Sequence, residues 1–213
     1  MHNADGVMQG QLDTPLDDLG RAQARAVGDV FAGTRPHRLL SSDLVRAADT
    51  AAALGATTGV PVTLDERLRE LHLGGWQGLT GDQARERFPD EWAAWRSGQD
   101  VRRGDGETYA DAGERAAACL REAMADLPAG GTVVAVTHGG TARATLGVLL
   151  ELDPGSWGRM APLGNTCWST LVEAPWGWRL ERHNAGLGPL LGPATGASPT
   201  APPAPSPDDE PVR

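Results

Sequence analysis

The order of apolar and polar positions predicts helices and short strands that follow one another along the chain. An apolar stripe at helical spacing, which includes Leu19, Ala26 and Val30, predicts a helix over Leu16–Phe31. Short apolar runs bounded by turn residues predict strands, and Ala-rich or amphipathic stretches predict the other helices. The expected strands cover Arg38–Ser41, Val60–Leu64 and Thr132–Thr137, with a hairpin over Cys167–Glu173 and Trp178–Arg182. The further expected helices cover Asp43–Thr58, Gly81–Arg96 with an interruption at Pro89, Thr108–Leu127 and Thr141–Leu150.

Strands that alternate with helices predict an α/β fold, a three-layer sandwich with a largely parallel sheet and helices on both faces. The run Thr132–Thr137 is continuously apolar or β-branched, which is typical of a strand buried on both faces. Residues 65–80 lack periodicity and contain Gly74, Gly75 and Gly78, so we expect a loop there. The tryptophans at 92, 95, 157, 168, 176 and 178 are expected to serve core and hairpin packing.

Length and composition fit one domain followed by a tail. The 213 residues, 40% of them hydrophobic, provide enough apolar surface for a single core. We expect a domain over residues 1–191, with a cap region at about 80–110. Residues 192–213 are dominated by Pro, Ala, Ser and Thr and end in a short acidic stretch. That composition predicts a disordered tail.

The formal net charge of −9 argues against nucleic acid or an anionic membrane as a partner. No apolar run has the length of a membrane-spanning helix, and residues 1–10 show no signal-peptide pattern, so we expect a cytoplasmic protein. Cys119 and Cys167 are too few for a disulfide framework, and no Cys/His cluster has zinc spacing. We expect both to be thiols and expect no metal ion.

His138 is the strongest single candidate for chemistry. It follows the run Thr132–Thr137, precedes Gly139 and Gly140, and stands before an expected helix. Ligands of open α/β sheets bind beyond the carboxyl ends of the strands, and a helix N-terminus favours an anion. The alternative is a structural histidine that caps the helix.

Arg46 and Glu70 are weaker candidates when each is considered alone. Arg46 follows a strand end and could offer its guanidinium group to a phosphate, or it could pair with Asp43 or Asp49 on the surface. Glu70 could act as a general acid, because a neighbouring anion raises the pKa of a carboxyl group. The alternative for Glu70 is an exposed loop glutamate.

Four segments, in this order, resemble the histidine phosphatase (phosphoglycerate-mutase-like) superfamily. The segment from Asn3 to Leu16 resembles the residues that follow the family's signature histidine. Ser41–Ala51 resembles the phosphate-pocket arginine motif, and Leu68–Gly78 resembles the proton-donor loop, with a phosphatase-type Leu-Gly-Gly-Trp sequence. Val136–Gly140 resembles the second-histidine motif.

The resemblance implies a phosphatase that works through a phosphohistidine intermediate, without a metal or an organic cofactor, on a small phosphorylated metabolite. Arg46 and His138 would clamp the phosphoryl oxygens, and Glu70 would protonate the leaving oxygen and then activate water. The residues expected to line the phosphate pocket are Asn3, Gln9, Gly10 and Gly139.

The sequence departs from the family at its beginning. Family members have an apolar strand and an Arg-His-Gly motif before the residue that matches Asn3, whereas only Met1 and His2 precede it here. His2 is no substitute, because it adjoins Asn3 and has neither the arginine nor the glycine. All 19 cationic residues are arginine, which indicates a GC-rich coding region, where gene starts are often misplaced. We therefore expect that the first strand and the nucleophile are missing and that the chain as given is inactive.

Two alternatives remain open at this stage. A phosphoglycerate mutase would use the same residues, although mutases of this family usually have a Tyr-Gly-containing loop followed by lysine, and this chain has no lysine. A non-catalytic relative that binds a phosphorylated ligand would fit a chain that is complete as given. Gln77, where many of the phosphatases have glutamate, is expected to affect substrate preference. The sequence leaves the oligomeric state open.

Overall fold

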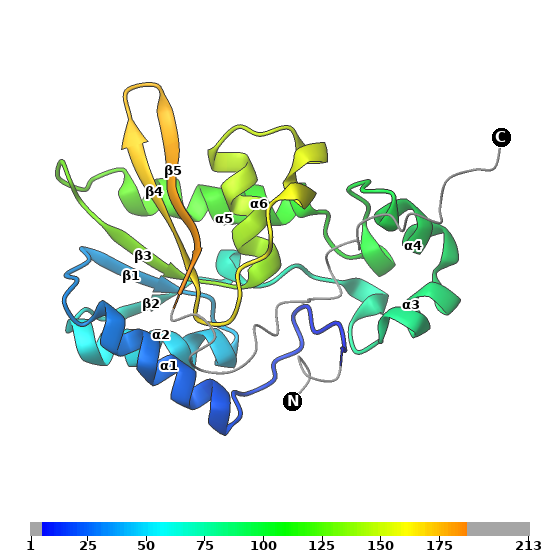
Figure 1. The fold of residues 1–213 in the computed structure, drawn as a ribbon, viewed down its shortest axis with the longest axis horizontal. Coiled ribbons are helices and arrows are strands. Elements are labelled where there is room, and N and C mark those ends of the chain that lie inside the picture. Colours follow the sequence, from blue (N-terminus) through cyan, green and yellow to red (C-terminus); the bar gives the residue numbers. More distant parts are fainter. Residues whose placement is uncertain (1–5, 187–213) are drawn as a thin grey trace.

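The computed structural model describes residues 6–186, which form an α/β fold (Figure 1). The helices are α1 Asp18–Phe31, α2 Val45–Thr58, α3 Gly81–Arg87, α4 Pro89–Arg96, α5 Tyr109–Met124 and α6 Gly139–Leu149. The strands are β1 Arg38–Ser41, β2 Val62–Leu64, β3 Val133–Val136, β4 Trp168–Ala174 and β5 Gly177–Ala185. Short 3-10 helices cover Glu66–Leu68 (η1), Gly74–Trp76 (η2), Arg103–Asp105 (η3) and Pro154–Arg159 (η4). The tail expected at 192–213 lies outside the described residues.

The three strands β2, β1 and β3 form a parallel sheet with β1 in the centre. The register pairs Ser41 with Leu64 on one side and with Val136 on the other, so the carboxyl ends of all three strands meet at one edge. The expected parallel sheet is therefore confirmed. The expected hairpin is confirmed as well, because β4 pairs antiparallel with β5.

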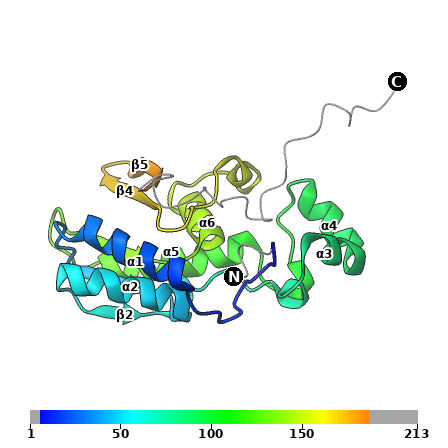
Figure 2. The ribbon, with the colours of Figure 1, turned by 60° about the horizontal axis from the view of Figure 1, so that its bottom comes forward.

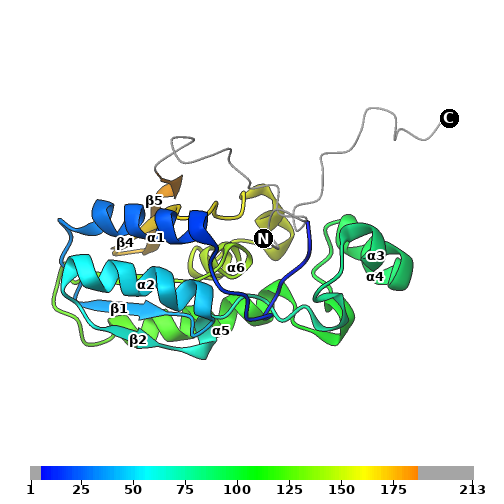
Figure 3. The same ribbon diagram turned by 90° about the horizontal axis from the view of Figure 1, so that it is seen from below.

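Helices cover both faces of the sheet, as expected for three layers. Leu39 packs with Val27 of α1 and Leu54 of α2, whereas Leu40 packs with Ala116 and Ala123 of α5. Successive residues of β1 therefore enter different cores, which is the two-residue period of a strand. Figures 2 and 3 show the same arrangement, with α1 and α2 on one side of the sheet and α5 on the other.

The sequence-based expectation for β3 was wrong in one respect. Side chains of β3 pack on both faces of the sheet, Val133 and Ala135 on one and Val134 and Val136 on the other, but all four residues stay half-buried. Within the described part of the chain β3 pairs with β1 alone, so one edge of this apolar strand has no sheet neighbour. Apolar composition predicted the strand correctly, but composition does not show whether a strand has one neighbour or two.

Three helix starts were placed wrongly by two residues: those of α1, of α6 and of α2, which begins at Val45 and not at Asp43. The first helix begins at Asp18 because the Asp17 carboxylate caps it, accepting a hydrogen bond of 2.8 Å from the Gly20 amide. The last helix begins at Gly139, two residues before the expected Thr141. The interruption expected at Pro89 is confirmed, since α4 begins there directly after α3.

Helices α3 and α4 lie in the segment expected as a cap, are called the cap below, and lie apart from the sheet (Figures 1 and 2). Its core is aromatic. Trp76 is fully buried, and its ring centroid lies 5.5 Å from that of Trp92 and 5.7 Å from that of Trp95. The expectation of core packing is thus confirmed for Trp92, Trp95 and Trp157, whereas Trp176 at the hairpin turn is 71% exposed.

The cap joins the sheet layers through a close crossing of two backbone segments, η2 and η3. The Glu107 amide donates to the His72 carbonyl over 2.7 Å. A Cβ atom on Gly106 would lie 2.0 Å from the His72 carbonyl oxygen and 2.7 Å from the Gly74 nitrogen. Position 106 therefore requires glycine, because both neighbours are backbone atoms that cannot rotate away.

We expect Gly106→Ala to lower the free energy of unfolding by about 2–3 kcal/mol, because the loop after Glu70 must move to admit the methyl group. Urea unfolding measures the change. Gly33→Ala is the matched control, because a Cβ at Gly33 would meet no atom within 4 Å, and it should change stability by less than about 0.5 kcal/mol. Equal urea midpoints for the two variants would contradict this account of the crossing.

Candidate active site

The parallel strands bring Ser42 and His138 together. Ser42 directly follows β1, and its amide donates to the Val136 carbonyl at the end of β3 over 2.9 Å. His138 lies two residues beyond β3, and its Nε2 is 2.9 Å from the Ser42 hydroxyl oxygen. His138 is the N-cap residue of α6, but its side chain makes no capping hydrogen bond. The structure therefore gives no support to the alternative in which His138 is only a helix cap.

The Glu70 carboxylate sits at the N-terminus of α6. Its Oε1 accepts hydrogen bonds from the amides of Thr141 at 2.9 Å and Leu71 at 3.0 Å, and its Oε2 accepts from the Gly140 amide at 3.1 Å. The Thr141 hydroxyl lies 3.0 Å from Oε1. Glu70 is thus not an exposed loop residue, because the amide groups and dipole that favour an anion at a helix N-terminus hold its carboxylate.

These contacts decide the protonation state of Glu70. Burial alone would raise the pKa of Glu70, but the charge of a protonated His138 and the three backbone amides together hold this pKa below its ordinary value. We expected a neighbouring anion to raise the pKa of Glu70, and the structure has the opposite shift. At neutral pH the Glu70 side chain in this arrangement is a carboxylate.

His138 shifts in the same direction for a different reason. Burial lowers the pKa of His138 to about 4, and the positive charges of Arg46 and Arg115 lower it as well. The Glu70 carboxylate favours the charged imidazole but does not outweigh them. The imidazole is therefore neutral at pH 7. Because it loses its proton well below neutrality, the amide donors of Leu71, Gly140 and Thr141 are what keep Glu70 charged there.

Arg46 extends from the first turn of α2 toward the segment that precedes α1. Its Nη1 donates to the Leu12 carbonyl at 2.7 Å and its Nη2 to the Gly10 carbonyl at 2.8 Å. Burial lowers the pKa of Arg46, and the charges of Glu70 and Asp13 oppose that shift. A surface pair with Asp43 or Asp49 is not what the structure has.

Asp43 is instead bound by Arg69. The Arg69 Nε lies 2.7 Å from the Asp43 Oδ1, and a second guanidinium nitrogen lies 2.5 Å from Oδ2. The pKa of Asp43 is lowered mainly by these hydrogen bonds. This pair ties the strand end after β1 to the loop that carries Glu70.

The segment before α1 packs against the Glu70 loop through Gln11 and Gln77. The Gln77 side-chain oxygen accepts from the Gln11 amide at 2.7 Å, and the Gln11 side chain donates to the Glu70 carbonyl at 3.0 Å. Gly10 has φ +54°, and a Cβ there would lie 2.5 Å from the Gln77 oxygen, so glycine is required. Gln77 therefore positions this segment, a contact that the sequence did not reveal.

Two other residues of the expected pocket are described by the structure. Gln9 is half-buried beside Gly10, and Gly139 is the first residue of α6. A Cβ on Gly139 would approach the Leu163 carbonyl oxygen to 3.1 Å. Asn3, which was also expected in this pocket, lies outside the described residues.

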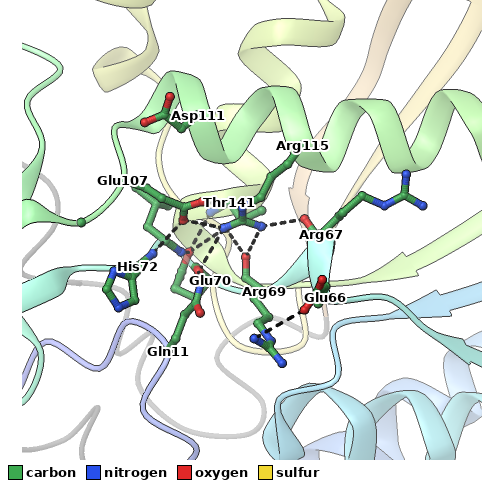
Figure 4. A network of polar contacts seen from close by, with 12 residues as sticks. Gln11, Glu66, Arg67, Arg69, Glu70, His72, Glu107, Asp111, Arg115 and Thr141 are labelled. Carbon is green, nitrogen blue, oxygen red and sulfur yellow. Dashed lines mark hydrogen bonds and ion pairs between the residues drawn. The ribbon is translucent and has the colours of Figure 1, made fainter.

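Arg115 of α5 anchors the loop that carries Glu70 (Figure 4). Its guanidinium group donates to the carbonyls of Arg67 at 2.6 Å, Arg69 at 2.8 Å and Glu70 at 3.1 Å. It also pairs with the Glu107 carboxylate at 2.7 and 2.8 Å, and Glu107 in turn accepts from the His72 amide at 2.8 Å. All three guanidinium nitrogens of Arg115 thus donate hydrogen bonds, and they hold the Glu70 backbone from the side of α5.

The sequence patterns did not point to Arg115, Glu107 or Thr141, and they indicated no role for Ser42. Arg115 and Glu107 lie far from Glu70 in the sequence, so no local pattern pointed to their contacts with its loop. For Thr141 the sequence pattern indicated only the start of an expected helix. His72 lies on the loop that carries Glu70, and its side chain is exposed.

The other histidines of the described chain are engaged elsewhere. His37 accepts at Nδ1 from the Thr132 amide at 3.2 Å, and His183 contacts Ser169 and the Ala161 carbonyl, each at 2.8 Å. Within residues 6–186 no three His, Cys, Asp or Glu side chains are grouped in a way that could hold a metal ion. Over the same residues, no helix combines the length and apolar character needed to cross a bilayer.

The arrangement provides a carboxylate, a neutral imidazole and a half-buried guanidinium group at one sheet edge. A guanidinium group and an imidazole can bind phosphoryl oxygens, and a carboxylate can carry a proton to or from an oxygen. The structure therefore brings Arg46, Glu70, His138 and Gly10 together.

Comparisons with known proteins agree with this geometry. The family model of the histidine phosphatase superfamily (branch 1) matches residues 1–186. A glucosyl-3-phosphoglycerate phosphatase from Mycolicibacterium vanbaalenii is 40% identical over 201 residues, which cover 86% of this chain and 89% of the relative. A probable phosphoglycerate mutase GpmB from Yersinia enterocolitica is 32% identical over 189 residues, covering 84% and 85%.

Solved structures show the same likeness. A mycobacterial glucosyl-3-phosphoglycerate phosphatase in complex with inorganic phosphate superimposes with a TM-score of 0.78 at 41% identity, covering 84% of this chain and 91% of that chain. The order of the sequence motifs, the parallel sheet and the family model agree. The chain belongs to branch 1 of the histidine phosphatase superfamily.

Proposed function

We propose that the protein is a phosphomonoesterase that acts on a small phosphorylated metabolite through a phosphohistidine intermediate. The observation that carries the proposal is the Glu70 carboxylate, held at the N-terminus of α6 beside His138 and Arg46. A site that only bound a phosphate would gain nothing from a carboxylate there, because the two anions repel each other. A carboxyl group that exchanges a proton with the substrate does require that position.

In the proposed mechanism the phosphoryl group passes first to a histidine and then to water. The histidine nitrogen bonds to phosphorus while the bond to the leaving oxygen breaks, and Glu70 gives its proton to that oxygen. Glu70 then takes a proton from water as the water oxygen displaces the histidine from phosphorus. The incoming phosphate opposes the amide donors around Glu70 and raises its pKa, which allows it to carry the proton.

His138 and Arg46 would hold the phosphoryl oxygens during both transfers. A neutral imidazole donates one hydrogen bond without a competing charge, and the guanidinium group offers a fork of donors. In the structure Arg46 donates to the carbonyls of Gly10 and Leu12, so we propose that it also shapes the loop around the phosphate. Gln9, Gly10 and Gly139 would line the pocket with the backbone of that loop and of α6.

The nucleophile is proposed to lie on a segment that the 213-residue sequence does not contain. The sequence has no Arg-His-Gly motif, and His138 is the one histidine within residues 6–186 that contacts this site. The open edge of β3 supports the proposal, because within the described residues its backbone groups on that side have no sheet partner and a further strand could pair there. A strand paired there would end at the same sheet edge as His138.

The similarity to glucosyl-3-phosphoglycerate phosphatases supports a phosphorylated glycerate derivative as the substrate class. We propose that the reaction needs no metal ion and that it takes place in the cytoplasm. A phosphoglycerate mutase is the second candidate, favoured by the similarity to GpmB. An assay with 3-phosphoglycerate, with and without a bisphosphoglycerate primer, separates the two, because a mutase forms the isomer faster than it releases phosphate.

We expect Glu70→Gln to lower kcat/KM for glycerol 3-phosphate by about 10² or more in the protein purified from its native cell. The loss should be much smaller for p-nitrophenyl phosphate, because that leaving group departs without a proton. Glu66→Gln, at an exposed glutamate four residues earlier, should keep activity within about twofold. Equal losses for both substrates would contradict the role of Glu70 as the acid.

We also expect stability to depend on pH through His138. In the unfolded chain its pKa is near 6.5, whereas in the folded protein burial lowers it to about 4, so the unfolded state binds more protons between these values. The free energy of unfolding should fall as pH decreases from about 6.5, by at most roughly 1.4 kcal/mol per pH unit. Urea unfolding between pH 7 and pH 5 should show a shallower slope for His138→Asn. Identical slopes would show that His138 is not held neutral by folding.

A further inference from the structure

Two arginine side chains are buried against the ring of Tyr109 without a hydrogen-bond partner. Arg103 of η3 is 1% exposed, and none of its three guanidinium nitrogens, all of them buried, has a partner among the described residues. Arg143 of α6 is 3% exposed, and its Nη1 and the Tyr109 hydroxyl are likewise buried and unpartnered. The Tyr109 ring centroid lies 4.7 Å from the Arg103 Cζ and 4.6 Å from the Arg143 Cζ. The two cations are therefore close enough to repel each other.

Neither guanidinium group forms an ion pair within residues 6–186. The π-face of the tyrosine ring stabilises a cation but leaves its N–H groups unbonded. Asp100 is the carboxylate beside Tyr109, but its two oxygens accept hydrogen bonds from the amides of Tyr109 at 2.7 Å and Ala110 at 2.9 Å, and the residue is exposed. Withdrawing an unpaired charge from water is costly, so we expect a negative partner for the two arginines.

A small cavity opens beside this cluster. It has a volume of about 50 Å³, whereas one water needs only about 10–15 Å³, so the cavity has room for a small ion. The residues that define its wall include Trp95, Gln99, Asp100, Tyr109, Arg143 and Trp157. Trp95 and Trp157 are buried, whereas Gln99 and Asp100 are exposed, so a solute can enter from the side of residues 98–100.

The cavity is separate from the proposed phosphate site. None of the residues at that site lines it, namely Gly10, Arg46, Glu70 and His138. Its wall instead combines Trp95 from α4 of the cap, Tyr109 from the start of α5 and Arg143 from α6. A ligand in the cavity would therefore contact the cap and the helices that cover the sheet at the same time.

We propose that this cavity binds one small monovalent inorganic anion, such as chloride, at Arg143 and Tyr109, and that Arg103 adds its positive charge to the site. Water molecules would satisfy the N–H and O–H donors but would leave two buried positive charges uncompensated, whereas an anion does both. A monovalent anion fits better than a phosphate dianion, because Asp100 already brings one negative charge to the cavity.

The anion would fasten the cap to α6. The folded protein has this site and the unfolded chain does not, so binding stabilises the folded state by mass action. Stability should therefore rise with the concentration of chloride and then level off as the site fills. The anion site is independent of phosphoryl transfer, because no residue of the proposed phosphate site takes part in it.

Thermal unfolding of the natively purified protein tests the site, in sodium chloride and in sodium gluconate of equal ionic strength, since gluconate is too large for the cavity. We expect a thermal midpoint about 4 °C or more higher in chloride. Arg143→Met should abolish the difference between the two salts, and Tyr109→Phe should weaken the apparent affinity for chloride about threefold. Arg96→Gln, which removes one charge from the exposed surface of α4, should keep the full difference.

Crystals of the same protein soaked in sodium bromide should show an anomalous bromine peak in contact with Arg143 and Tyr109. Equal midpoints in the two salts for the unaltered protein would overturn the anion site, as would a chloride effect that survives Arg143→Met or bromide bound only at the surface. If Arg143→Met does not fold, the bromide peak and Tyr109→Phe decide, since the latter removes a single hydroxyl. A protein that shows the chloride effect but hydrolyses no phosphomonoester would overturn the proposed phosphatase and leave the anion site standing.

Discussion

The hydrogen bonds between the Glu70 carboxylate and the N-terminus of α6 are the interaction on which the site depends. A carboxylate withdrawn from water is costly unless it is bonded, and three backbone amides with the Thr141 hydroxyl bond it here. The amides of Gly140 and Thr141 belong to the turn that follows His138, whereas the Leu71 amide belongs to the loop that carries Glu70. One interaction therefore positions the Glu70 carboxylate and the His138 imidazole relative to each other, while Arg115 and Glu107 hold the Glu70 backbone from the side of α5.

The electrostatics follow from that placement. The amides hold Glu70 charged at neutral pH, and burial with Arg46 and Arg115 nearby holds His138 neutral. In the proposed mechanism a dianionic phosphate brings negative charge beside the Glu70 carboxylate and raises the pKa of Glu70. That shift would let Glu70 hold the proton that the leaving oxygen requires.

The sequence predicted the helices and strands that carry the site, but it did not predict most of the side-chain contacts that hold the site together. The strand ends after Ser41 and Val136 could be predicted because apolar runs and the parallel order are local patterns, and parallel strands end at one edge. The position of Glu70 at α6 and the anchoring by Arg115 join segments about 45–70 residues apart, so no local pattern encodes them. The pKa of Glu70 was expected in the wrong direction because its amide partners were unknown. The half-burial of β3 was not predicted, because the composition of a strand does not show whether it has one sheet neighbour or two.

The central claim is that this site passes a phosphoryl group through a histidine outside the described residues. The most direct measurement is rapid quenching of the natively purified protein with a labelled phosphomonoester, followed by peptide mass spectrometry under neutral conditions that preserve phosphohistidine. The account predicts one phosphoryl group on a histidine that precedes Asn3 and is followed by glycine. A phosphoryl group on His138, or turnover without any phosphohistidine, would contradict it.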